Sequence, residues 1–255
     1  MTQNRIAVSS TTTFRADLAR KMAEEWKLDY IEDPLCDRVK DYTYLLLYTP
    51  EYLGLQNTGE RKPTPFHIDF FSGKMHFRSQ RAGRRNELLA RAMGISPNEN
   101  PFIVDATAGL GRDSFILATV GYRVLMLERS PILYLLLQDA LERGKNNPVI
   151  DRMSLLHVDA IQWLTSSAGS QKPDIVYLDP MFPIREKSAS VKKEMIILQN
   201  LLGTDEDCDS LFLAASACAT HRVVVKRHRL APNIAGREPS FSYVGKSSRF
   251  DIYQL

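Results

Sequence analysis

Cysteine is scarce in this chain, and long apolar runs are missing from it. Its 255 residues include three cysteines, Cys36, Cys208 and Cys218. They stand apart from one another and from histidines at metal-ligand spacing, so the sequence predicts neither a disulfide framework nor a metal site. This usage is typical of the reducing cytosol, and we therefore expect a cytoplasmic protein.

No apolar segment reaches the ~18 residues that a membrane-spanning helix needs. The first residues also lack the charged start and apolar run of an export signal. We expect neither a membrane protein nor an exported one. Coiled-coil heptads are missing too, so a monomer is the expected state. With 44% hydrophobic and 25% charged residues, the composition is that of an ordinary globular protein.

The most informative stretch lies near the middle of the chain. A short apolar run ends on Asp105, and Gly109 and Gly111 then permit a tight loop before an apolar segment at helical spacing. A second apolar run, residues 123–127, ends on Glu128. Strand, glycine loop, helix and strand predict an open, mostly parallel α/β sheet, in which both carboxylates face the ligand crevice.

Two cofactor classes use such a loop, and the residues favour one of them. A dinucleotide site needs a third glycine where Ser114 stands, and Asp105 would repel a pyrophosphate. S-adenosylmethionine carries cationic groups that Asp105 could help to hold, and Glu128 can accept from ribose hydroxyls under either hypothesis. The candidate cofactor residues of this segment are Asp105, Ala106, Gly109, Gly111 and Glu128.

A proline-rich motif carries the sharpest chemical signal. Residues 174–178 form a predicted strand, and Asp179-Pro180-Met181-Phe182-Pro183 follows. The prolines remove backbone donors and leave acceptors, while Phe182 adds a flat apolar face. We interpret Asp179, Pro180 and Phe182 as catalytic: the carboxylate and a local carbonyl would accept the protons of a nucleobase amine, and Phe182 would stack an extruded base. The alternative is a structural Asp-Pro turn.

The positive charge is modest in total and uneven in distribution. The formal net charge is +3. Basic residues gather before residue 92, just after the proline motif, and in the C-terminal part, which predicts either a phosphate-binding surface around the crevice or ordinary solvated faces. The candidate RNA-binding residues are Arg78, Arg81, Arg84, Arg85, Lys187, Lys192, Lys193, Lys226, Arg227 and Arg249.

The segment before the glycine loop is less informative. Residues 53–65 are predicted to form a loop or linker, and residues 66–81 alternate around Ser72-Gly73 like a β-hairpin. A helix over residues 86–93 then leads into the central strand. We predict an N-terminal α+β region, residues 1–83, with that hairpin and a possible RNA-binding role, followed by a catalytic domain, residues 84–255.

Several motifs together resemble one protein family. The stretches VDATAGLGRD, VLMLER, VYLDPMFP, KSASVKKEM, RVVVKR and SSRFDIY are similar to the ribosomal RNA small subunit methyltransferase J family, and the similarity extends from about Trp26 to Tyr253. The resemblance implies a class I methyltransferase fold with a mostly parallel seven-stranded sheet flanked by helices. It also implies methylation, with S-adenosylmethionine, of a guanine N2 in small-subunit ribosomal RNA or the 30S particle.

By motif position, the resemblance implies further cofactor contacts. They fall at Arg112, Asp113, Glu128, Arg129, Asp159, Ala160 and Asp179. From the residues alone, Asp159 could equally cap a helix. Three hypotheses stay open: a guanine-N2 methyltransferase (or one acting on another nucleobase amine), a dinucleotide-dependent oxidoreductase, and a non-catalytic RNA-binding protein.

Overall fold

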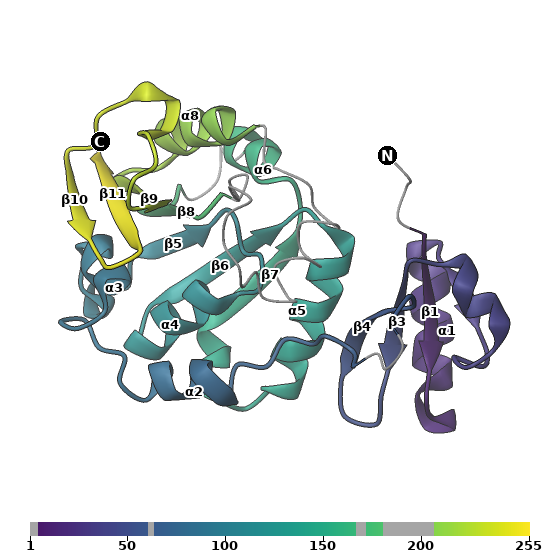
Figure 1. The fold of residues 1–255 in the computed structure, drawn as a ribbon. Coiled ribbons are helices and arrows are strands. Elements are labelled where there is room, and N and C mark those ends of the chain that lie inside the picture. The colour runs from purple at the N-terminus through teal and green to yellow at the C-terminus, as the bar shows by residue number, and fades with distance from the viewer. Residues whose placement is uncertain (1–4, 61–63, 167–171, 181–206) are drawn as a thin grey trace.

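Two β-sheets organise the chain (Figure 1). The computed structural model describes residues 5–60, 64–166, 172–180 and 207–255. The smaller sheet contains β1 (Ile6–Ser10), β2 (Asp29–Ile31), β3 (Tyr44–Tyr48) and β4 (Leu53–Asn57). The larger contains β5 (Phe102–Asp105), β6 (Arg123–Glu128), β7 (Met153–His157), β8 (Ile175–Leu178), β9 (Arg222–His228), β10 (Phe241–Val244) and β11 (Ser248–Gln254).

The larger sheet has the strand order β10-β11-β9-β8-β5-β6-β7. Strands β7, β6, β5, β8 and β9 are parallel, and β11 and β10 add an antiparallel hairpin at one edge. The chain runs outward from β5 through β6 to β7, then returns to β8 on the other side of β5. The strand order therefore reverses between β5 and β8, where ligands bind in open α/β sheets. The predicted mostly parallel seven-stranded sheet is confirmed.

Helices cover both faces of this sheet. The α-helices of the described residues are α1 (Ala16–Trp26), α2 (Gly73–Ser79), α3 (Leu88–Met93), α4 (Arg112–Val120), α5 (Pro131–Arg143), α6 (Ala160–Ser166) and α8 (Cys208–Cys218). Short 3-10 helices are η1 (Thr13–Arg15), η2 (Asp37–Asp41), η3 (Pro97–Glu99), η4 (Ile150–Arg152) and η6 (Ile234–Gly236). Successive residues of β5 serve opposite cores: Ile103 packs in the cluster with α4 and α5, and Val104 in the cluster with α6 and α8.

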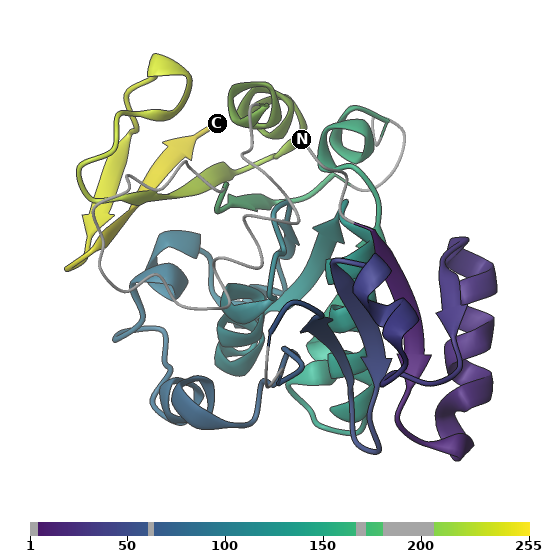
Figure 2. The same ribbon diagram turned by 45° about the vertical axis from the view of Figure 1, so that its right-hand side comes forward.

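The N-terminal sheet lies beside α5, on the side of the molecule opposite the C-terminal hairpin (Figures 1 and 2). Its order is β2-β1-β3-β4, with β1 parallel to both neighbours. Trp26 at the end of α1 packs against Tyr134 of α5 and His157 of β7, with ring centroids 5.8 and 4.9 Å away. These aromatic contacts fasten the N-terminal sheet to the larger one.

The hairpin predicted for residues 66–81 is wrong. Phe66 forms an isolated bridge with Leu55, and residues 73–79 form α2. The Asp69 carboxylate accepts from the backbone N–H of Phe71 at 2.8 Å, a local turn that competes with strand pairing. Met75 and Phe77 alternate in sequence, yet Phe77 is 55% exposed, so the two side chains do not share a buried face.

The linker predicted for residues 53–65 is also partly wrong, because residues 53–57 form β4. This strand pairs antiparallel with β3, with Leu46 opposite Leu55. Its Leu53 and Leu55 are buried in the core, although Gly54 interrupts the apolar pattern.

The domain boundary predicted at residue 83 stays a prediction. Within the described ranges, no helix is long and apolar enough to cross a membrane.

Candidate functional site

Three carboxylates meet at the C-terminal edge of the larger sheet. Asp105 ends β5, Glu128 ends β6, and Asp179 follows β8, the other neighbour of β5. The turn after β5 is bonded to β8: the N–H of Ala106 donates to the Tyr177 carbonyl at 3.0 Å. The N–H of Asp179 donates to the Thr107 hydroxyl at 2.6 Å. The first glycine-loop turn and the proline motif are therefore fixed to each other.

The glycine loop needs its glycines for backbone conformation. Gly109 and Gly111 have φ of +54° and +66°, which side chains with a Cβ rarely adopt. The N–H of Gly109 donates to Glu128 at 2.9 Å, and the N–H of Ser130 donates to the other oxygen of the same carboxylate at 2.8 Å. Buried Glu128 thus joins the glycine loop to the end of β6.

Asp105 is the most deeply buried of the three carboxylates, with 1% exposure. Burial, with smaller contributions from the nearby Asp113 and Asp179 carboxylates, raises its pKa to about 7, although hydrogen bonds from Ser114 and Thr107 oppose the shift. Ser114 Oγ donates to Asp105 at 2.5 Å and the Thr107 N–H donates at 3.1 Å. The residue in place of a third glycine is therefore a hydrogen-bond donor to Asp105.

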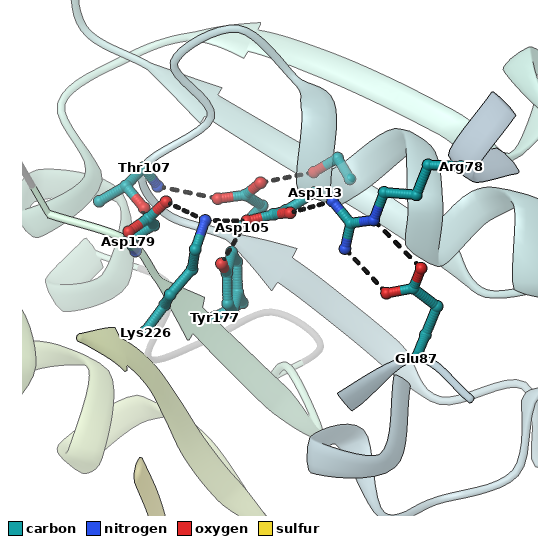
Figure 3. Close-up of polar contacts among 9 residues, drawn as sticks. Arg78, Glu87, Asp105, Thr107, Asp113, Tyr177, Asp179 and Lys226 are labelled. Atoms are coloured by element: carbon teal, nitrogen blue, oxygen red, sulfur yellow. Dashed lines mark hydrogen bonds and ion pairs between the residues drawn. The ribbon is translucent and has the colours of Figure 1, made fainter. Parts of the chain in front are cut away.

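Lys226 of β9 lies between two carboxylates (Figure 3). Its Nζ is 2.7 Å from Oδ2 of Asp179 and 2.7 Å from Oδ2 of Asp113, in the first turn of α4. The buried Tyr177 hydroxyl donates to the same oxygen of Asp113 at 2.7 Å. Lys226, from the strand next to β8, therefore connects α4 to the proline motif.

The electrostatics of this cluster keep its ions charged and its phenol neutral. Burial acts to raise the pKa of Asp113, but Lys226, Arg78 and the Tyr177 hydrogen bond lower it overall. Burial acts to lower the pKa of Lys226, and the two carboxylates raise it overall. The pKa of Tyr177 is raised well above 10 by burial and by the surrounding carboxylates.

A second ion pair continues the cluster toward the N-terminal segment. Arg78, in α2, lies 3.3 Å from Asp113 and 2.9 Å from Glu87, which immediately precedes α3 (Figure 3). The charges therefore alternate in sign along a series of contacts that includes the Asp179 side chain. The series in order is Glu87, Arg78, Asp113, Lys226 and Asp179.

The remaining predicted cofactor residues surround the same edge. Arg112 is exposed at the start of α4, and Ala160 begins α6. Arg129 pairs with Asp207 at 2.6 Å. The carboxylate of Asp159 accepts from the N–H of Gln162 at 2.9 Å, so Asp159 caps α6 whatever else it contacts.

The predicted RNA-binding residues divide into exposed and inward-facing groups. Arg81, Arg84 and Arg85 are exposed, and the Arg81 guanidinium lies 3.9 Å from the ring centroid of Phe77. Arg78 is half-buried in its ion pairs. Phe182, Lys187, Lys192 and Lys193 lie outside the described residues.

The side chains of three of these predicted residues already bond to groups inside the protein. Arg227 is 4% exposed and its Nε donates to the Pro232 carbonyl at 3.1 Å. Arg249 pairs with buried Asp251 at 2.8 Å and donates to the Ala231 carbonyl at 2.8 Å. Lys226 faces Asp113 and Asp179. None of the three presents a free cationic surface to an RNA backbone.

Two contributors to the site, Thr107 and Tyr177, are not evident from the sequence pattern. Thr107 and Tyr177 hold Asp179 and Asp113 by hydrogen bonds. Tyr177 lies in an apolar strand, where an aromatic residue is expected to pack in the core. A tyrosine two residues before a candidate catalytic aspartate was the available signal, because a buried phenol needs a hydrogen-bond partner.

Comparisons with known proteins agree with this geometry. The SAM-dependent methyltransferase family matches residues 22–255. A Marinobacter nauticus protein named ribosomal RNA small subunit methyltransferase J is 43% identical over 255 residues, covering 98% of this chain and 91% of the relative. A Coxiella burnetii protein of the same name is 42% identical over 252 residues, covering 98% of this chain and 97% of the relative. The SAM-dependent methyltransferase NGO1261 from Neisseria gonorrhoeae has a crystal structure that matches this one with a TM-score of 0.74 and 32% sequence identity. The match covers 97% of this chain and 95% of the NGO1261 chain.

Proposed function

The chain belongs to the ribosomal RNA small subunit methyltransferase J family of S-adenosylmethionine-dependent methyltransferases, and from this membership we propose that it methylates N2 of a guanosine in small-subunit (16S) ribosomal RNA. One observation carries the proposal. Asp179, at the end of β8, has a side chain that is 40% exposed although its neighbours Tyr177 and Pro180 are buried. A carboxylate accessible beside a cofactor loop is suited to an amine substrate.

The residues at this edge fit S-adenosylmethionine. Asp105 presents a carboxylate where a dinucleotide would place its phosphates, and the Ser114 hydroxyl, in the place of the third glycine, is committed to Asp105. Glu128 would hold the ribose hydroxyls, since a carboxylate accepts several hydrogen bonds. Asp105 would stabilise the cationic end. The dinucleotide-dependent alternative is disfavoured by this arrangement. When bound, S-adenosylmethionine supplies an electrophilic methyl group.

The role of the protein is to prepare and orient the amine. The lone pair of the guanine N2 is delocalised into its ring, so the amine is a weak nucleophile. The Asp179 carboxylate and a carbonyl near Pro180 accept hydrogen bonds from its two protons, which favours a tetrahedral nitrogen aligned for in-line displacement. The nitrogen would gain the methyl group as that group's bond to the donor sulfur breaks, and would release one proton. We assign to Asp179 the receipt of this proton and its passage to water.

The substrate base must leave its stack to reach the crevice. Extrusion of a nucleotide into a pocket is the general solution for enzymes that modify a base. We assign the stacking of the extruded guanine to Phe182, and phosphate contacts to Arg81, Arg84 and Arg85. Their exposure in the segment between α2 and α3 supports this assignment. Phosphate contacts position the RNA, and the base-binding residues select the nucleotide.

The substrate is either the small-subunit RNA or the 30S particle, and we propose that the enzyme acts on it as a monomer in the cytoplasm. The three free cysteines, one of them buried, are consistent with a reducing compartment. Gel filtration with light scattering tests the monomer directly. A dimer at micromolar concentration would contradict it.

Product identification tests the proposed reaction. Purified protein is incubated with methyl-labelled S-adenosylmethionine and small subunits from cells lacking this gene, and the RNA is digested to nucleosides. We expect labelled N2-methylguanosine. A label on another base would overturn the guanine assignment. Binding of the methyl donor with no label in subunits, naked RNA or assembly intermediates would overturn the activity.

A further inference from the structure

Lys226 holds the catalytic carboxylate in a manner that the proposed reaction leaves unassigned. We propose that Lys226 is a positioning residue, which fixes the Asp179 carboxylate relative to the cofactor loop by bridging it to Asp113. The inference rests on the proposed function, because it assumes that Asp179 accepts the substrate amine. Lys226 acts through Asp179 and has no contact of its own with the reacting atoms.

The geometry supports bridging over simple neutralisation. The ammonium is 2.7 Å from one oxygen of each carboxylate, so the two anions are held on opposite sides of one cation. Asp113 belongs to the first turn of α4, which continues the cofactor loop. Asp179 belongs to the loop after β8. The two partners therefore come from the two segments whose spacing decides whether the amine meets the methyl group.

The Asp113 end of the bridge is rigid. The carboxylate also receives the Tyr177 hydroxyl at 2.7 Å and lies 3.3 Å from the Arg78 guanidinium. The Asp113 side chain is 12% exposed, whereas that of Asp179 is 40% exposed. Lys226 consequently transmits the position of a well-fixed carboxylate to a more accessible one. This arrangement is what an acceptor needs when an error of about 1 Å can slow a reaction ~100-fold.

The alternation of side chains along β9 explains why Lys226, and not the adjacent Arg227, contacts Asp179. Residues 222, 224, 226 and 228 of β9 share one face, and Arg227 points to the opposite face, where it bonds Pro232. Arg222, on the same face, is near the other end of the strand and donates to the Ala92 carbonyl at 3.4 Å. Arg222→Met is therefore a matched control that removes a cation from the same face away from Asp179.

The test is a double-mutant cycle on the single-turnover rate of methyl transfer, measured at saturating cofactor and RNA. For Lys226→Met we expect a rate about 100-fold lower, with RNA affinity unchanged. Lys226→Arg should recover most of the rate. In the Asp179→Asn background, Lys226→Met should cost nothing further, because the residue acts through Asp179. Arg222→Met should keep the wild-type rate.

A second cycle separates positioning from stabilisation of buried Asp113. If Lys226 only neutralises Asp113, then Lys226→Met should not lower the rate of methyl transfer in the Asp113→Asn background. In the otherwise wild-type protein, the loss of rate should then be accompanied by a lower thermal unfolding temperature. Positioning predicts that the rate still falls in the Asp113→Asn background, though by less than in the wild type, because the amide oxygen left by that substitution can still accept from Lys226. An unchanged rate for Lys226→Met, or an equal loss with and without Asp179, would overturn the inference. Wild-type product identity is scored separately, so a label on another base overturns the guanine assignment without affecting the Lys226 comparison.

Discussion

The hydroxyl of Ser114 lies 2.5 Å from Oδ2 of Asp105, and both side chains are buried. The pair joins the first turn of α4 to the end of β5, so the loop between them is closed by a hydrogen bond as well as by its glycines. The bond favours the ionised carboxylate, whereas burial favours the neutral acid and raises the pKa of Asp105 to about 7. Asp105 therefore changes its charge close to neutral pH.

This shift predicts a pH-dependent stability. The folded pKa of about 7 lies above the unfolded value of 3.8, so the folded protein retains a proton that the unfolded chain has released. The contribution of Asp105 to stability is complete below about pH 4 and is lost as the pH rises to 7. Relative to Asp105→Asn, we expect the wild type to lose about 2 kcal/mol between about pH 5 and pH 8. Urea unfolding at several pH values measures this.

Ser114→Ala provides the control for this assignment. Loss of the hydroxyl removes a hydrogen bond that favours ionised Asp105, so the pKa of Asp105 should rise further and the pH-dependent loss of stability should extend above pH ~7. A pH-independent difference between the wild type and Asp105→Asn would contradict the assignment to Asp105.

Glu128→Gln should weaken cofactor binding. The substitution keeps the size of the side chain but removes the charge and one of the two oxygens that accept from Gly109 and Ser130. Hydrogen bonds to a charged group contribute roughly 1.5–3 kcal/mol, so we expect the Kd for S-adenosylmethionine to rise about 10- to 100-fold by calorimetry. Glu99→Gln is the control, because Glu99 also accepts from a backbone N–H but belongs to η3, before β5. Equal affinities of the two variants would argue against a role for Glu128.

Gly111→Ala should destabilise the fold more than Gly236→Ala. Both glycines have positive φ, +66° and +63°. An added Cβ at Gly111 would lie 2.8 Å from Cδ2 of Leu137 and 3.1 Å from Cζ of Phe70, whereas nothing lies within 4 Å at Gly236. We expect about 1–2 kcal/mol for the backbone strain alone at Gly236 and about 2–4 kcal/mol at Gly111. Chemical denaturation measures both, and equal losses would show that crowding at Gly111 is relieved.

Removal of two exposed arginines should weaken RNA binding without changing base selection. Arg84→Gln with Arg85→Gln removes charges from the exposed segment between α2 and α3, so the affinity for small-subunit RNA should fall and the slope of log K against log salt should flatten by about 2. Arg123→Gln with Lys172→Gln removes the same charge from exposed residues at the amino ends of β6 and β8. Equal effects in filter binding would mean that RNA contacts are not concentrated in the segment between α2 and α3.

Local sequence patterns predicted the central part of the fold correctly. The apolar runs ending on Asp105 and Glu128, with the glycines between them, are contiguous and depend on few distant contacts. The strand β1 escaped prediction because it is short and is defined by parallel pairing with residues 44–48, far along the chain. The ion pairing of Arg78 was not predictable for a related reason. Its ion pair with Asp113 joins residues 35 positions apart, which alternation cannot reveal.

The sequence pattern predicted the carboxylates of the site but not the side chains that bond to them. Asp105, Glu128 and Asp179 end predicted strands, and parallel pairing then brings them to one edge. Lys226 and Arg227 are adjacent cations at the end of an apolar run, and composition does not say which one faces the crevice. The pleat of β9 decides, because it directs neighbouring side chains to opposite faces. Lys226 thus reaches Asp179 while Arg227 is buried against Pro232.

The most direct test of the account is the single-turnover formation of N2-methylguanosine by Asp179→Asn, compared with the wild type on the same small-subunit substrate. Both reactions are run at saturating cofactor and RNA, so that a change in binding does not enter the rate. Asparagine keeps the shape of the side chain but has one acceptor oxygen and no charge. We expect a rate about 100- to 1,000-fold lower, the cost of losing a preorganised polar contact in an active site. A wild-type rate for Asp179→Asn would contradict the account.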